Sequence, residues 1–219
     1  FNLGQISLFK GDINSAIINL QNSLINKSDN YKIYRFLGIA QFLKGEKECL
    51  KNLKKSIEMN QKEELSKVLY NVVYSKIINK KQGKYFENRF QELQSSGPII
   101  LQRSIEKELI DYIYQRNTID LNDYQDPTFG KARGTDYNLF EDNCNILNLI
   151  KADLIKKIKD YFDSEVYFIE SFFTILEGSS IVEKHNHLDR LDSLKNLDLY
   201  KNKYSLVYYL KTGDINCSS

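Results

Sequence analysis

The sequence has little of several features that would point to a particular environment or partner. Its three cysteines, Cys49, Cys144 and Cys217, are far apart and form no Cys-x-x-Cys pair, so neither a disulfide framework nor a structural zinc site is predicted. No apolar run approaches the roughly 20 residues that a membrane-spanning helix needs. The net charge is only +2, which predicts binding neither to nucleic acid nor to an anionic membrane. These absences favour a cytoplasmic protein.

Tryptophan is also absent and histidine occurs only twice, but residues that can fill a core are plentiful. Hydrophobic residues make up 42% of the chain, with 15 Tyr and 12 Phe among them, and charged residues make up 27%. These fractions are ordinary for a globular protein. A chain of 219 residues holds one large domain or two small ones, and we expect two.

The first 60 residues contain an internal repeat. Residues 1–24 align with residues 35–57: Gly4 matches Gly38 at a spacing of 34, and Leu20 matches Leu53 at a spacing of 33. A period of about 34 residues, with two helices joined by a glycine-containing turn, is typical of tetratricopeptide repeats. The small and aromatic-apolar positions resemble that family, although Tyr34 stands where tryptophan is usual.

The repeat predicts where its two kinds of glycine lie. We expect Gly4 and Gly38 at points where two antiparallel helices approach closely, and the Lys-Gly-Asp and Lys-Gly-Glu segments in the turns between helices. Each repeat leaves an apolar face that only a neighbour can cover, so a helix from Glu63 to about Asn79 is expected to cap the stack.

A change of composition separates this part from the rest. The segment Ser95-Ser96-Gly97-Pro98 is the clearest break, since Gly and Pro disfavour a continuing helix. We expect helical repeats over 1–80, a linker over 81–97 and a second domain over 98–219. In the second domain the periodicity predicts helices over 104–117 and 146–162, and strands over 99–102, 166–178, 179–189 and 203–214. The fold class is therefore α+β, with helical hairpins followed by an antiparallel β core supported by helices.

Both histidines lie in one short segment, His185-Asn-His187-Leu-Asp189. On a strand, residues two apart share a face, so His185 with His187, or His187 with Asp189, can bind one metal ion. Two histidines and one carboxylate are the ligands of non-haem Fe(II) oxygenases. A plainer alternative is a pair of solvated histidines beside an aspartate.

The surrounding sequence resembles a known family. Gly178, the His-Asn-His-Leu-Asp segment, the aromatic run 204–210 and Gly213-Asp214 occur in the order found in 2-oxoglutarate-dependent oxygenases of the prolyl-hydroxylase-like type. Residues 129–143 and 170–180 are similar to a bacterial branch of such enzymes that carries tetratricopeptide repeats upstream. The resemblance covers roughly residues 98–217. It implies an incomplete double-stranded β-helix, or jelly-roll, with Fe(II) as cofactor and 2-oxoglutarate as co-substrate.

The resemblance also implies roles for particular residues. The metal pair is either His187 with Asp189 or His185 with His187, and His187 belongs to both alternatives. Tyr204 and Tyr208 would share one face of a strand, where a phenol could hydrogen-bond the 2-oxoglutarate carboxylate; aromatic core packing is the alternative. The family's distal histidine and its basic co-substrate anchor are expected beyond Ser219, so this fragment alone should be inactive.

The implied function is hydroxylation of a peptide or a small molecule, with the helical repeats holding a peptide or protein partner. The alternative is a non-catalytic tetratricopeptide interaction module with a degenerate β domain. A hydrolase-like or storage metal site built on the same histidines is a third hypothesis.

Overall fold

The computed structural model describes residues 1–26, 29–78, 98–116, 119–120, 132–135, 138–176, 188–194 and 196–210. The chain forms two compact units, which are described one at a time. The first unit contains Phe1–Ile99 together with Leu188–Tyr204, and the second contains Ile100–His187 together with Ser205–Ser219. Within the described ranges, no helix is both long enough and apolar enough to cross a membrane.

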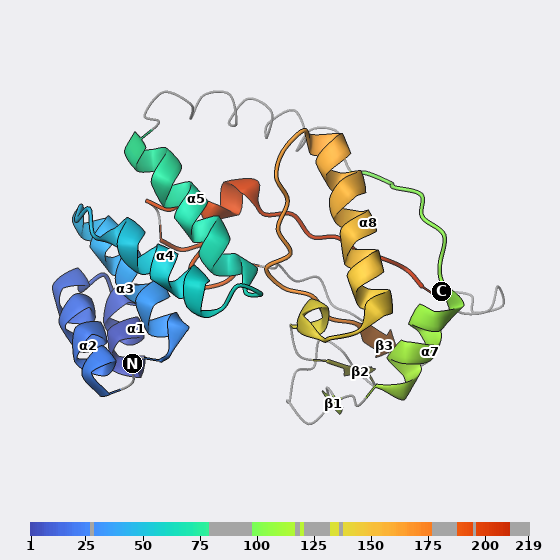
Figure 1. The fold of residues 1–219 in the computed structure, drawn as a ribbon, viewed down its shortest axis with the longest axis horizontal. Coiled ribbons are helices and arrows are strands. Elements are labelled where there is room, and N and C mark those ends of the chain that lie inside the picture. The colour runs from blue at the N-terminus through green and yellow to red at the C-terminus, as the bar shows by residue number, and fades with distance from the viewer. Residues whose placement is uncertain are drawn as a thin grey trace. The chain divides into compact units, whose positions relative to one another are not determined.

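The first unit is built from helical hairpins, as predicted. Its helices are α1 (Asn2–Phe9), α2 (Ile13–Asn26), α3 (Tyr31–Lys44), α4 (Cys49–Met59) and α5 (Glu64–Ile78). Each helix packs against the next one along the chain, which Figure 1 shows from the blue α1 to the green α5. The predicted capping helix over 63–79 is therefore present as α5.

The four repeat glycines lie where the sequence predicts. A Cβ atom on Gly4 would stand 2.6 Å from Leu20 Cγ, and one on Gly38 would stand 2.7 Å from Leu53 Cγ. Both distances are shorter than side-chain contacts allow, so the helices approach this closely only because these residues are glycines. Gly11 and Gly45, in the two turns, have φ of 82° and 83°, a left-handed conformation that glycine adopts at little cost.

A polar junction joins the second hairpin to α5. The Ser56 hydroxyl donates to the Tyr31 carbonyl at 2.9 Å and also lies 2.9 Å from the Ser66 hydroxyl. Glu63 accepts the Ser66 N–H at 2.9 Å, which caps the start of α5, and its carboxylate pairs with Arg35 of α3. Buried polar groups need such partners, so this junction fixes α5 against α3 and α4.

The second unit contains two helices and a small sheet. Helices α7 (Lys107–Gln115) and α8 (Asn145–Phe162) confirm the two predicted helices. The strands β1 (Ile119–Asp120), β2 (Ala132–Gly134) and β3 (Thr174–Leu176) pair antiparallel in that order, with Gly134 opposite Ile119 and Thr174. A 3₁₀ turn, η2 (Leu139–Glu141), precedes α8. The core consists of Leu109, Ile113, Leu139, Leu147, Ile150, Leu154 and Phe173.

The strand predictions are largely wrong for the described residues. Residues 99–102 and 203–210 form no strand, and the predicted strand over 166–178 is reduced to β3. Ile100 is 81% exposed, whereas Tyr208 and Leu210 pack against the core of the second unit without joining a sheet. The described strands do not amount to a jelly-roll; residues 177–187 and 211–219, which carry the rest of that prediction, lie outside the described ranges.

Candidate functional site

The predicted metal ligands fall only partly within the described residues. His185 and His187 lie outside them. Asp189 is described, and it begins a tight turn in the first unit. Its Oδ1 atom accepts the N–H groups of Leu191 at 2.6 Å and of Asp192 at 3.3 Å, and its Oδ2 atom lies 3.6 Å from Lys203 Nζ. Both oxygens of this carboxylate therefore already have partners.

Asp192 completes the turn in a reciprocal way. Its Oδ2 atom accepts the Asp189 N–H at 2.7 Å and the Lys203 ammonium group at 2.9 Å. Each of the two side chains thus accepts the backbone N–H of the other residue, three positions away. The same reciprocal hydrogen bonding defines a helix capping box. Among the residues described, no cluster of three or more His, Cys, Asp or Glu side chains is placed to hold a metal ion.

The two tyrosines predicted to contact 2-oxoglutarate lie in different units. Tyr204 belongs to the first unit and is 49% exposed. Tyr208 belongs to the second unit, where its hydroxyl donates to the Ser104 carbonyl at 2.8 Å and accepts from Arg103 Nη1 at 2.7 Å. Because residues 203–210 form no strand, the predicted common face of these two phenols is absent.

Arg103 is the centre of the best-defined polar cluster in the second unit. Its side chain is 8% exposed. It donates to Asp153 Oδ2 at 2.7 Å and to both oxygens of Glu106, at 2.6 and 2.7 Å, and its Cζ atom stands 5.4 Å from the centre of the Tyr208 ring. These contacts tie the segment before α7 to α8 and to residue 208.

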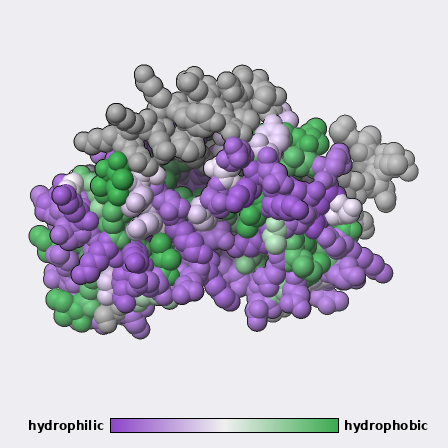
Figure 2. Space-filling view, turned by 45° about the horizontal axis from the view of Figure 1, so that its top comes forward, coloured by the Kyte–Doolittle hydropathy of each residue, from purple (hydrophilic) through white to green (hydrophobic). Residues whose placement is uncertain are grey.

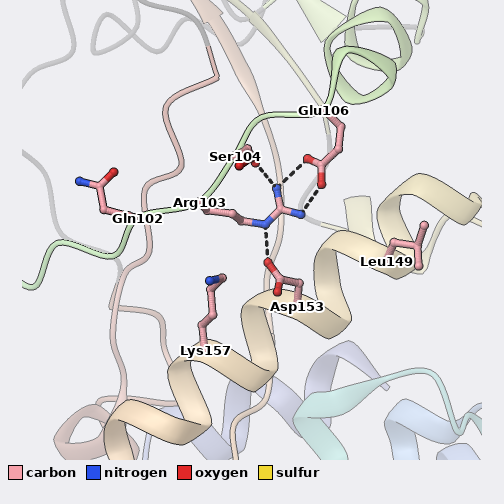
Figure 3. Close-up of a pocket in the computed structure, with 7 residues that line it drawn as sticks. All are labelled: Gln102, Arg103, Ser104, Glu106, Leu149, Asp153 and Lys157. Carbon is pink, nitrogen blue, oxygen red and sulfur yellow. Dashed lines mark hydrogen bonds and ion pairs between the residues drawn. The ribbon is translucent and has the colours of Figure 1, made fainter.

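An open pocket of about 750 Å³ lies beside Arg103. It is lined by Gln102, Arg103, Ser104, Glu106, Leu149, Asp153 and Lys157. Figure 3 shows Asp153 and Lys157 rising from α8 below the Arg103 guanidinium, with Glu106 on its other side. The pocket thus combines two cationic and two anionic side chains, with Leu149 as its apolar residue.

Arg103 and Glu106 each favour the charged form of the other. The hydrogen bonds to Glu106 raise the pKa of Arg103, and the Arg103 guanidinium in turn lowers the pKa of Glu106. Since Arg103 already donates hydrogen bonds to Glu106, Asp153 and Tyr208, few of its N–H groups are left for an anionic ligand. A negatively charged ligand in this pocket would have to rely on Lys157.

A second charged cluster ties α7 to the segment that precedes α8. Tyr112 donates its hydroxyl to Asp142 at 2.6 Å, and Arg116 binds the same carboxylate with two nitrogens, at 2.7 and 2.9 Å. Burial, followed by the hydrogen bond to Asp142, raises the pKa of Tyr112 to about 12. The phenol is therefore neutral at physiological pH, and its role is to join two elements.

Two features of the structure were missed at the sequence level. The first is the Arg103 cluster, for which the only local signal was the spacing of Arg103 and Glu106 by three residues. The second is a segment that we call the leucine strap, Leu188–Tyr204, whose burial against the helical unit was not predicted. Its signal is a leucine at every third position, namely Leu188, Leu191, Leu194 and Leu197.

The surface and the comparisons add no further indication of a ligand. On the face shown in Figure 2, hydrophilic residues predominate and the apolar ones form small, separate patches. Compared with known proteins, the chain matches no family model, no curated protein and no solved structure. Any function must therefore be argued from the residues of this chain.

Proposed function

We propose that the chain is part of a 2-oxoglutarate- and Fe(II)-dependent dioxygenase that hydroxylates a peptide or a small molecule. The observation that carries the proposal is the sequence His185-Asn-His187-Leu-Asp189, followed by the aromatic run 204–210 in the order that this class of enzyme uses. In this proposal the helical hairpins are tetratricopeptide repeats, and the second domain is an incomplete jelly-roll.

The metal pair in this proposal is His185 with His187. The contacts of Asp189 support this choice, because its carboxylate accepts two N–H groups and lies beside Lys203. An aspartate that turned to a metal ion would leave the Leu191 N–H without this acceptor, at a cost of about 1–3 kcal/mol for a buried donor. The iron, when bound with 2-oxoglutarate, would supply the oxidising power needed to hydroxylate an unactivated C–H bond.

The contribution of the two tyrosines differs in this proposal. The Tyr208 hydroxyl has a single proton, which it gives to the Ser104 carbonyl. It therefore acts as an anchor of the chain beside Arg103, and Tyr204 stays a proposed contact for the co-substrate.

The test is anaerobic Fe(II) titration of the full-length gene product, with and without 2-oxoglutarate. We expect a weak visible charge-transfer band that requires both components and disappears in His187→Ala. The band should survive in Asp189→Ala if the histidines form the pair. Asp160→Ala, which removes an exposed carboxylate of α8, is the matched control.

The alternative function is a non-catalytic interaction module in which the helical unit binds a partner. The specific observation that favours it is that the helical unit has a core of its own. Failure of the wild-type protein to retain iron or to develop the band would contradict the dioxygenase and leave this alternative.

A further inference from the structure

The leucine strap belongs to the helical unit although it lies between two parts of the second unit in the sequence. Residues 188–204 join Phe1–Ile99 in one compact body, whereas the residues before and after them belong to the other. Figure 1 shows its C-terminal 3₁₀ turn, η3 (Leu199–Asn202), beside α5. The helical unit therefore packs against a segment that is not a helix of its repeats.

The backbone of the leucine strap explains the leucine spacing. Four turns follow one another, with N–H groups of Asp192, Leu194, Leu197 and Lys201 donating to carbonyls three residues earlier at 2.9–3.2 Å. Turns of this kind have about three residues per turn, so side chains three apart lie on the same side. Leucines at every third position then form one apolar edge.

This edge is buried in the core of the helical unit. Leu191 is 6% exposed and Leu197 is 1% exposed, while Leu194 and Leu199 pack against the same core. That core includes Leu69 and Val73 of α5. By contrast Leu188, at the start of the leucine strap, is 59% exposed and provides a natural control.

An ion pair accompanies this apolar contact. Lys76 of α5 donates to Asp198 of the leucine strap at 2.7 Å, with both side chains about one-third exposed. The turn itself is held by Asp189, Asp192 and Lys203 within the strap. The strap thus organises its own turns, shares a hydrophobic core with α5 and forms one ion pair with it.

We propose that the α5 side of the helical unit is a binding site for a segment with leucine at every third position, and that residues 188–204 of the same chain are its occupant. The helical unit then holds this strap in place, and a free partner cannot use the same face while the strap is docked. The proposal does not depend on the dioxygenase activity.

The first experiment measures binding of a fluorescently labelled peptide with the sequence of residues 188–204 to the full chain. In wild type the site is filled, so the peptide should bind weakly. In Leu191→Ser/Leu197→Ser the site is vacated, and the peptide should bind about tenfold more tightly, because a ligand that fills a site about nine-tenths of the time raises the apparent Kd by that factor. Leu188→Ser should behave like wild type.

Two outcomes of this experiment would overturn the proposal. One is a folded double variant that binds the peptide no better than wild type does. The other is a double variant that loses its helical circular dichroism, since a site that does not exist without its occupant is only part of the core. Equal binding of a peptide with the same charged residues, but with serine in place of its leucines, would also contradict the stated specificity.

A milder pair of variants tests the docked strap without a change in the core. Lys76→Glu should increase chymotryptic cleavage after Tyr200 and Tyr204 by up to about fivefold, the scale of one part-exposed ion pair. Lys76→Glu/Asp198→Lys reverses both charges and should restore the wild-type rate. Equal cleavage of the single and double charge variants would show that this contact does not hold the strap in solution.

Discussion

At the residue scale, the first unit depends on positions that leave no room for a different side chain. Gly38 lies where a Cβ atom would meet both Leu53 Cγ at 2.7 Å and the Cys49 carbonyl oxygen at 3.0 Å. A side chain can change its rotamer, whereas the carbonyl oxygen belongs to α4 and moves only with the helix. Close packing of α3 against α4 is therefore the property most sensitive to a single methyl group.

Gly38→Ala is expected to destabilise the protein by about 1–3 kcal/mol, the usual cost of overpacking a core. The measurement is the free energy of unfolding in urea, followed by circular dichroism. Gln21→Ala, at an exposed position of α2, is the control and should change stability by less than about 0.5 kcal/mol. A Gly38→Ala protein as stable as that control would show that the two helices can move apart.

The buried ion pair between Arg35 and Glu63 leads to a second prediction at this scale. The two side chains are 9% and 10% exposed, so each charge depends on the other. Glu63→Leu leaves the arginine unpaired and is expected to cost about 3–5 kcal/mol. Arg35→Met/Glu63→Leu removes both charges and should cost clearly less than the sum of the two single substitutions.

A double-mutant cycle in urea measures this difference. The exposed pair Lys44–Glu46, with side chains 44% and 32% exposed, is the matched control and should show a coupling of less than about 1 kcal/mol. Additive effects at Arg35 and Glu63 would mean that the two charges act independently.

At the scale of elements, the leucine strap shows that a segment without regular secondary structure can complete a helical core. Its contact with α5 includes a titratable ion pair. Lys76 lowers the pKa of Asp198, and Lys201 reinforces this effect from within the strap. A carboxyl whose pKa is lowered on folding stabilises the folded state above its unfolded pKa, near 4, and this contribution is lost as the pH falls through the folded pKa.

We therefore expect the stability difference between wild type and Asp198→Asn to be present at about pH 7 and to shrink toward zero at about pH 3. The difference in urea midpoint between the two proteins isolates Asp198 from the other carboxyl groups. Lys76→Met/Asp198→Asn is the control and should show no further loss on acidification relative to Asp198→Asn. A difference that stays constant between the two pH values would contradict the assigned ion pair.

At the scale of the whole molecule, sequence neighbours do not always share a compact unit. The chain passes from one unit to the other after residues 99, 187 and 204. The helical unit and the second unit have separate hydrophobic cores, and Leu191 and Leu197 belong to the core of the helical unit. Local stability should follow these cores and not the order of the sequence.

Hydrogen exchange of Leu53→Ala tests this expectation. Leu53 is fully buried between the helices of the first unit, so the cavity is expected to cost about 2–5 kcal/mol. Amide protection should fall together in α3, α4 and the leucine strap, and α8 should keep most of its protection. Leu154→Ala, in the core of the second unit, should give the converse pattern. Equal loss in both units for either variant would show a single cooperative core.

The sequence by itself determined the helical part of this protein. The repeat of about 34 residues predicted the hairpins and the two close approaches at Gly4 and Gly38, and the apolar periodicity predicted α5, α7 and α8. These predictions succeed because a helix satisfies its backbone hydrogen bonds within a few residues, so that a local pattern is enough.

Only the tertiary structure decided what the remaining segments contact. The stretch 203–210 has the composition of a strand, yet Tyr208 bonds to Ser104 and Arg103, about 105 residues earlier in the sequence. The carboxylate of Asp189 accepts a backbone N–H of its own turn and lies beside Lys203. Leucines that follow it in the sequence pack into the core of the helical unit. A strand, an ion pair or a docked strap takes its stability from partners distant in sequence, and local periodicity carries no information about those partners.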